Sequence, residues 1–400
     1  MYLKGIKISL SVILINYYCI KIIIGNLLPY CSIICFGIML TCLFLDIIQN
    51  RNGKVVIRSE FRLWIAYLAI CMFTSLVCSN TFGIMLDLVD YIQRIVVAYS
   101  VYYVCSSEQS IKWPINLITL VSIVAAVSII CNTSDFGRRL GSEGSASEAI
   151  SANDIGALMA FGCFTILFVF NNKSRISFIR MVLVAAISIL FIIVISISGS
   201  RKAIVAVMIL YVFLILLCIK SVFNSISSMQ LLLITAVIVG VLILAYTHLF
   251  PLLENTSLYI RLFGDKAAGA LQSNDGRMLL IEQALKDFLE HPIIGLGYNN
   301  FVYYHGNYTH CTYVEPLASS GIWGVLYLIP YVSILKKCLF LSRHSVENVI
   351  LQKALLAFYI SFLFVGVGIP FIYKDVPNVV LGMFLGAQEI GFRKLYNDWR

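Results

Sequence analysis

Long apolar runs alternate with short polar segments along most of this chain. A helix needs about 20 mainly apolar residues to cross a bilayer, and the runs predict about twelve such helices. We therefore expect an all-α, polytopic integral membrane protein, with residues 1–400 forming a single membrane domain. The predicted spans are residues 6–24, 27–48, 62–79, 84–104, 114–132, 153–171, 179–197, 202–219, 230–250, 315–335, 350–372 and 376–392.

One long polar stretch interrupts this pattern at residues 251–314, and we expect it to be a single extracytoplasmic loop. Within it, apolar residues recur at helical spacing over residues 276–291. This spacing predicts an amphipathic helix that lies in the outer membrane interface with its apolar side toward lipid. Asn274 and Asp275 are expected to cap its start, and Pro292 to end it.

Composition excludes a soluble protein. The chain is 60% hydrophobic and 12% charged, with a mean hydropathy of +0.91, whereas soluble domains carry about 25% charged residues. The net charge of +9 is explained by Lys and Arg in cytoplasmic loops, so no nucleic-acid partner is expected. The sequence has no CxxC pair, no HExxH motif and no Walker A loop, and we expect no metal and no cofactor.

The basic residues predict the orientation of the chain. With both termini cytoplasmic, about 18 of the 29 Lys and Arg residues fall on the inner side, as expected for inner loops. The remainder run against that trend, and this suggests an anionic ligand on the outer side. These outer residues are Lys21, Arg94, Arg138, Arg139, Arg201, Lys202, Arg261, Lys266, Arg277, Lys286 and Lys374.

Arginines in the outer segments are the first candidates for binding such an anion. Arg201 lies in a turn so short, Ser198–Lys202, that its guanidinium is expected at the membrane edge. It either ends a span by snorkelling to the headgroups or grips a diphosphate with its planar fork. Arg277 is either a solvated helix residue or part of the same anion site. The same alternatives hold for three other candidate substrate-binding residues, Arg138, Arg139 and Arg261. Ser200 of the turn is also a candidate substrate-binding residue.

Three of the five histidines lie in the polar loop, and His310 is the candidate base. A neutral imidazole, with a pKa near 6.5, can take a proton from a sugar hydroxyl, although a histidine at this place can also be a polar anchor. Glu315, five residues later, either orients His310 or caps the following helix. The many tyrosines of the loop form an interfacial belt or sugar-stacking surfaces.

Five segments follow one another in a distinctive order: Ser198–Arg201, Asp275–Arg277, His291–Gly297, His310–Glu315 and Gly321–Gly324. This order resembles the O-antigen ligase/polymerase superfamily, over roughly residues 130–330. Arg139-Leu140-Gly141 followed by Asn153 also resembles that family, whereas Cys311 stands where its members often have Asn.

The resemblance implies a multi-pass glycosyltransferase of the bacterial inner (plasma) membrane that uses sugars linked to undecaprenyl diphosphate on the outer side. A Wzy-type polymerase of O-antigen or capsule is the preferred interpretation, because the sequence is compact and rich in isoleucine. An O-antigen ligase that transfers glycan to lipid A–core is the first alternative, and a transporter for lipid-linked sugars is the second. A chain-length regulator and a flippase of the same pathway are the expected protein partners.

The expected mechanism follows from these residues and the resemblance. Arg201 and Arg277, with Arg139, would hold the donor diphosphate, and His310 would deprotonate the acceptor hydroxyl, giving inversion without a metal.

Overall fold

The computed structural model describes residues 2–20, 29–49, 57–77, 81–132, 151–169, 178–223, 259, 267–344 and 349–398. The regular secondary structure of these residues is helical throughout, as the apolar runs predict. In chain order the elements are α1 (Tyr2–Ile15), η1 (Asn16–Ile20), α3 (Pro29–Gln49), α4 (Ser59–Val77), α5 (Thr81–Glu108), α6 (Lys112–Asn132), α7 (Ala152–Val169), α8 (Phe178–Ser198), α9 (Arg201–Phe223), α13 (Ala267–Glu290), α14 (Asn300–His305), α15 (Glu315–Ser320), η3 (Gly321–Gly324), α16 (Val325–His344), α17 (Val349–Gly366), η4 (Phe371–Tyr373) and α18 (Asp375–Asp398).

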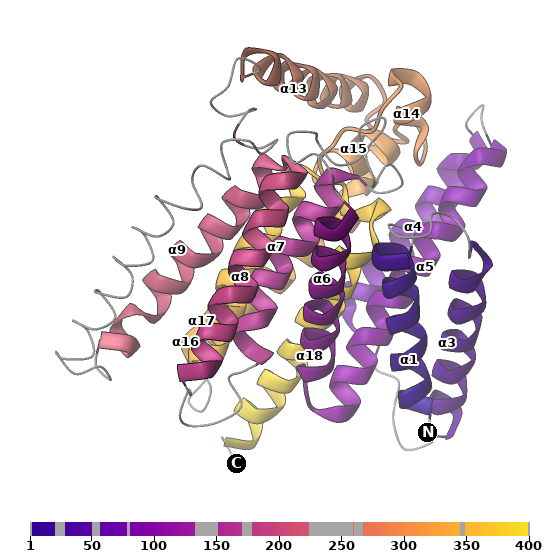
Figure 1. The fold of residues 1–400 in the computed structure, drawn as a ribbon. Coiled ribbons are helices and arrows are strands. Elements are labelled where there is room, and N and C mark those ends of the chain that lie inside the picture. The colour runs from indigo at the N-terminus through magenta and orange to yellow at the C-terminus, as the bar shows by residue number, and fades with distance from the viewer. Residues whose placement is uncertain are drawn as a thin grey trace.

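Most long helices run side by side as a bundle, and α13 lies across one end of it (Figure 1). We call this end the α13 end. Helix α1 begins and α18 finishes at the opposite end (Figure 1). Helix α5 packs along α18, α9 along α17, and α7 between α6 and α8. The bundle therefore brings the start of α9, the start of α7 and the start of α18 toward α13.

Five described helices are long and apolar enough to cross a membrane. Eleven of the predicted spans overlap described helices, and the predicted span 230–250 lies outside the described residues. The total of twelve spans stays a prediction. The five helices are Cys31–Gln49, Lys112–Asn132, Ala152–Val169, Glu315–His344 and Val349–Gly366.

The structure changes several details of the polar stretch. Helix α13 begins at Ala267, so Asn274 and Asp275 lie inside it and the predicted cap is wrong. Its end at Glu290 agrees with the stop expected at Pro292. The predicted span 315–335 lies in the continuous helical stretch Glu315–His344, in which a single 3-10 turn, Gly321–Gly324, separates α15 from α16. The extracytoplasmic placement of residues 251–314 stays a prediction.

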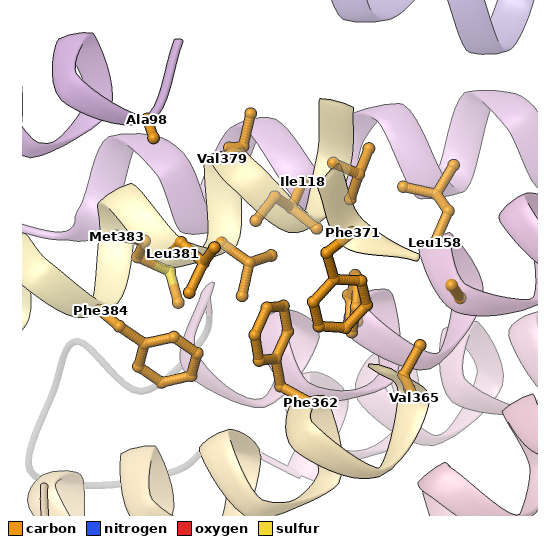
Figure 2. Close-up of a cluster of buried hydrophobic side chains, with 14 of the residues drawn as sticks. Ala98, Ile118, Leu158, Phe362, Val365, Phe371, Val379, Leu381, Met383 and Phe384 are labelled. Atoms are coloured by element: carbon orange, nitrogen blue, oxygen red, sulfur yellow. The ribbon is translucent and has the colours of Figure 1, made fainter. Parts of the chain in front are cut away.

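The core lies where α17, η4 and α18 meet α5, α6 and α7, and aromatic rings fill its centre (Figure 2). Phe362 packs on Phe371 with ring centroids 4.5 Å apart and on Phe384 at 5.9 Å. Helix α18 approaches α5 so closely that a Cβ on Gly382 would lie 2.3 Å from the Ala98 carbonyl oxygen. In lipid, helices associate through such close packing, because lipid tails are as apolar as the side chains themselves.

A buried polar cluster holds the end of the bundle opposite α13. The Glu60 carboxylate is 1% exposed, and it forms an ion pair with Arg58 at 3.4 Å and another with Lys337. Ser333 also donates a hydrogen bond to Glu60, at 3.0 Å. A buried carboxylate needs such partners, since removing one would leave a charge without compensation. This cluster fixes the start of α4 to α16, and we assign it a structural role.

Candidate functional site

The turn between α8 and α9 places Arg201 at the α13 end. Ser198 ends α8, Gly199 adopts a positive φ of 66°, and α9 starts at Arg201. Ser200 is buried, and its carbonyl accepts the first backbone hydrogen bond of α9 at 3.2 Å. A Cβ on Gly156 of α7 would lie 2.6 Å from the Ser200 Cβ. The structure thus shows Ser200 shaping the turn against α7, while Arg201 occupies the positive end of the helix dipole.

Three cationic side chains converge here from two helices. Arg277, half-buried on α13, is an electrostatic neighbour of Arg201: burial lowers the pKa of Arg277, and the Arg201 charge lowers it further. Lys202 interacts with both guanidinium groups. A Cβ on Gly368 would lie 2.2 Å from the Lys202 Nζ, so the lysine crosses the link that follows α17. Like charges gathered at one place favour an anion between them.

His310 lies in the segment between α14 and α15, between Tyr308, an electrostatic neighbour of Arg277, and Cys311. It adopts a left-handed backbone with φ of 58°, which is uncommon for a residue other than glycine. The Tyr308 ring packs against the imidazole, with centroids 4.2 Å apart and planes tilted by 54°. The next residue, Cys311, is an electrostatic neighbour of Lys202. The strained turn therefore presents the imidazole next to the cations, as a functional site often does.

Glu315 holds this turn through two hydrogen bonds. Its Oε2 accepts from the Thr309 backbone N–H at 2.9 Å, and its Oε1 accepts from the Tyr373 hydroxyl at 2.8 Å. Glu315 is fully buried at the start of α15. It therefore fixes the backbone next to His310 and joins it to η4, which is a different role from orienting the ring or capping the helix.

Replacing Glu315 by alanine is expected to lower the stability of the protein. The buried Thr309 N–H and the Tyr373 hydroxyl would each lose a partner, at about 1–3 kcal/mol per group. Glu315→Gln keeps an acceptor oxygen and should lose much less. The thermal midpoint of the detergent-solubilised protein measures the effect. An alanine variant with the midpoint of the wild type would contradict this assignment.

The histidine turn is also tied to the end of α17. The Thr312 N–H donates to the Gly366 carbonyl at 2.8 Å, and the Phe371 N–H donates to the Thr312 hydroxyl at 3.0 Å. That hydroxyl in turn donates to the Ile369 carbonyl. These hydrogen bonds join residues more than fifty positions apart in sequence, and they fix the histidine turn to the segment that follows α17.

Two glycine-containing segments of the sequence, His291–Gly297 and Gly321–Gly324, contact each other through their backbones. The segment His291–Gly297 runs against the α15–η3 junction, and backbone atoms of the two meet directly. A Cβ on Gly295 would lie 2.5 Å from the Ser320 nitrogen, and one on Gly321 would lie 2.4 Å from the Pro292 oxygen. Both glycines have positive φ, of 69° and 60°. Three backbone hydrogen bonds of 2.8 Å join the segments: Leu296 N to Ala318 O, Gly297 N to Ser319 O, and Ile322 N to Pro292 O.

His305 joins α14 to α13 and lies apart from the imidazole of His310. Its Nε2 is 2.8 Å from the Asp287 carboxylate of α13. His291 is exposed at the end of α13. Of the loop histidines, His310 is the one that the structure places beside the cationic cluster.

Three ion pairs join the elements at this end of the bundle. Lys374 Nζ is 2.8 Å from the Asp154 carboxylate at the start of α7. Burial lowers the pKa of Lys374, but the adjacent Asp154 more than offsets this, so its pKa is raised. Arg94 of α5 pairs with Asp375 at 3.4 Å and with Asp90 at 3.7 Å. These pairs fix α5, α7 and α18 to one another at the α13 end.

The structure brings together some of the predicted residues and adds others. Arg201, Arg277, His310 and Glu315 lie in one region, with Ser200 buried behind it. Lys202, Tyr308 and Lys374 were not singled out by sequence reasoning. Lys202 and Lys374 carried a usable signal, since both belong to the outer basic residues. Three predicted residues fall outside the described part of the chain: Arg138, Arg139 and Arg261.

Part of the chain matches a family model. Residues 186–329 match the model of a family described as O-Antigen ligase. The matched range contains the Ser198–Arg201 turn, Arg277, His310 and Glu315. No curated protein matches the chain.

Proposed function

We propose, from the membership of this chain in the O-antigen ligase/polymerase superfamily, that it is a polysaccharide polymerase of a bacterial plasma membrane. Members of the family are glycosyltransferase-like enzymes of O-antigen pathways. The polymerase transfers a growing glycan from undecaprenyl diphosphate onto a lipid-linked repeat unit at the outer face. The observation that carries the proposal is that Arg201, Lys202 and Arg277 are electrostatic neighbours, and that Arg277 and Lys202 also interact with Tyr308 and Cys311 of the turn that holds His310.

The cationic cluster binds the donor diphosphate. A guanidinium keeps its charge at all relevant pH values and matches two phosphate oxygens at once. The lowered pKa of Arg277 has its origin in burial and in the Arg201 charge, and an anion between the two would relieve the second cause. As the bond from the sugar to the diphosphate breaks, negative charge grows on the leaving oxygen, and the fixed cations stabilise it.

His310 acts as the general base. The acceptor hydroxyl oxygen attacks the anomeric carbon, the bonding pair to the diphosphate oxygen leaves with the diphosphate, and the imidazole takes the hydroxyl proton. Attack opposite to the leaving group inverts the anomeric centre. Glu315 and Thr312 keep the imidazole in place through the backbone of its turn. The proposed mechanism needs no cofactor, because the cationic side chains supply the positive charge that stabilises the leaving diphosphate.

A ligase is the second candidate, because the matched family is described as O-Antigen ligase. It would use the same donor site and transfer the glycan to lipid A–core. A transporter for lipid-linked sugars has less support. The charged residues within α5 that a transporter would use are Asp87, Asp90 and Arg94, and Arg94 forms ion pairs with Asp90 and with Asp375 at the start of α18.

The surface glycan of a deletion strain, resolved by length on a gel, tests the proposal. A single repeat unit on lipid A–core, or on the lipid carrier, is expected if polymerisation is lost. Core without glycan, with full-length polymer accumulating on undecaprenyl diphosphate, would identify a ligase instead. Unchanged glycan would contradict both transfer functions.

A further inference from the structure

A patch of aromatic and paired polar side chains adjoins the cationic cluster, and the proposed mechanism leaves it unused. Tyr308 lies at its centre. Its ring packs on His310 at 4.2 Å between centroids and lies 6.4 Å from the Tyr373 ring. Lys374 and Asp154, 2.8 Å apart, complete the patch. We call these four residues around the imidazole, Tyr308, Tyr373, Lys374 and Asp154, the tyrosine patch.

Tyr308 lies between two regions of different charge. Its electrostatic neighbours include Arg277 of the cationic cluster and both members of the Lys374–Asp154 pair. Burial raises the pKa of the Tyr308 hydroxyl, so the group is a neutral hydrogen-bond donor at physiological pH. The cationic cluster carries three positive charges, whereas the charges of Lys374 and Asp154 cancel. The first region suits a diphosphate, and the second suits an uncharged polar ligand.

A sugar ring matches this second region. The C–H face of a sugar can pack on an aromatic ring. Its hydroxyls can accept a hydrogen bond from the lysine ammonium and donate one to the carboxylate. Tyr308 is half-exposed, so part of its ring is accessible. A hydroxyl of a sugar held against that ring comes within reach of the imidazole, because the two side chains are in contact.

We propose that the tyrosine patch is the acceptor subsite, where Tyr308 stacks on the acceptor sugar while Lys374 and Asp154 bind its hydroxyls. This inference rests on the proposed function, because it takes the cationic cluster as the donor diphosphate site. The two reacting ends are thereby separated by charge: the nucleophilic sugar of the acceptor lies over the neutral patch, and the leaving diphosphate of the donor lies over the cations. His310 stands between them.

Binding measurements with two separate probes test this division. One probe is undecaprenyl diphosphate, and the other is the oligosaccharide released by mild acid from lipid-linked repeat units of the deletion strain. Binding to the full chain in nanodiscs is followed by saturation-transfer NMR for the glycan and by calorimetry for the lipid. We expect Tyr308→Ala to weaken glycan binding about tenfold and to leave lipid binding unchanged. Tyr308→Phe keeps the ring and should bind glycan nearly as the wild type does.

Two variants serve as controls. Tyr304→Ala removes an exposed tyrosine of α14 and should change neither probe. Arg277→Gln should show the opposite pattern to Tyr308→Ala, with lipid binding lost and glycan binding kept. The retained lipid binding of Tyr308→Ala also shows that the variant is folded.

The outcomes separate this inference from the proposed function. If the wild type binds both probes and Tyr308→Ala keeps the glycan, the acceptor subsite is wrong and the proposed function stands. The same conclusion follows if the wild type binds the lipid but not the glycan. If the wild type does not bind undecaprenyl diphosphate, the proposed function itself fails.

Discussion

Replacing His310 by alanine is expected to reduce glycosyl transfer by about 10²–10⁴-fold, the range that a positioned general base contributes. The imidazole is the group that the strained turn presents beside the cationic cluster. Removing it leaves the donor site intact, so the lipid-linked substrate still binds and the loss falls on turnover. In cells, the expected result is loss of long-chain glycan with the protein still in the membrane.

The measurement is extension of lipid-linked repeat units by purified protein in detergent, with product length read on a gel. His310→Gln, which keeps a polar side chain but has no basic nitrogen, should be as inactive as His310→Ala. His291→Ala is the matched control, because this histidine is exposed in the same stretch and should leave activity unchanged. Full-length polymer from His310→Ala would rule out the imidazole as base.

Arg277→Gln and Arg201→Gln are each expected to lower transfer by about 10²–10³-fold, the usual effect of removing one preorganised electrostatic group from a transition state. Arg277→Lys keeps the charge but loses the planar fork, so it should recover only part of the activity. Arg343→Gln changes an exposed arginine at the end of α16 and serves as the control.

Stability should respond to Arg277 in a different way from activity. The pKa of Arg277 is lowered by burial and by Arg201, which means that the folded protein disfavours this charge. Arg277→Gln should therefore not lower the thermal midpoint of the substrate-free protein, even as activity is lost. A midpoint that falls together with activity would instead assign Arg277 a structural role. Undecaprenyl diphosphate should raise the midpoint of the wild type and not that of the variant.

The apolar runs were sufficient to predict where most helices lie, because a bilayer requires about 20 apolar residues per helix regardless of its neighbours. The helix containing Arg277 was also predictable from its spacing. Its start was not, since residues 267–275 have no clear apolar period, and the caps expected at Asn274 and Asp275 lie within the helix. Local signals thus located the elements and misplaced some of their ends.

The glycine motifs show what a linear motif leaves open. The sequence places Gly295 and Gly321 in two separate segments and gives no reason for either. The structure supplies one: both take positive φ, and each lies against the backbone of the other segment at a distance that excludes a Cβ. Likewise, only the packed bundle explains why residue 382 is a glycine: it lets α18 approach the backbone of α5.

The sequence by itself determined that this protein is helical, apolar enough for a membrane, and supplied with basic residues that break the positive-inside trend. Only the tertiary structure decided which of them meet. Arg201 and Arg277 are far apart in the chain and become neighbours because α13 lies over the start of α9. Tyr308 and Lys374 join them because the end of α17 and η4 pack on the histidine turn. Burial and charge act through space, so the sequence could name Arg201, Arg277 and His310 as candidates but could not show that they meet.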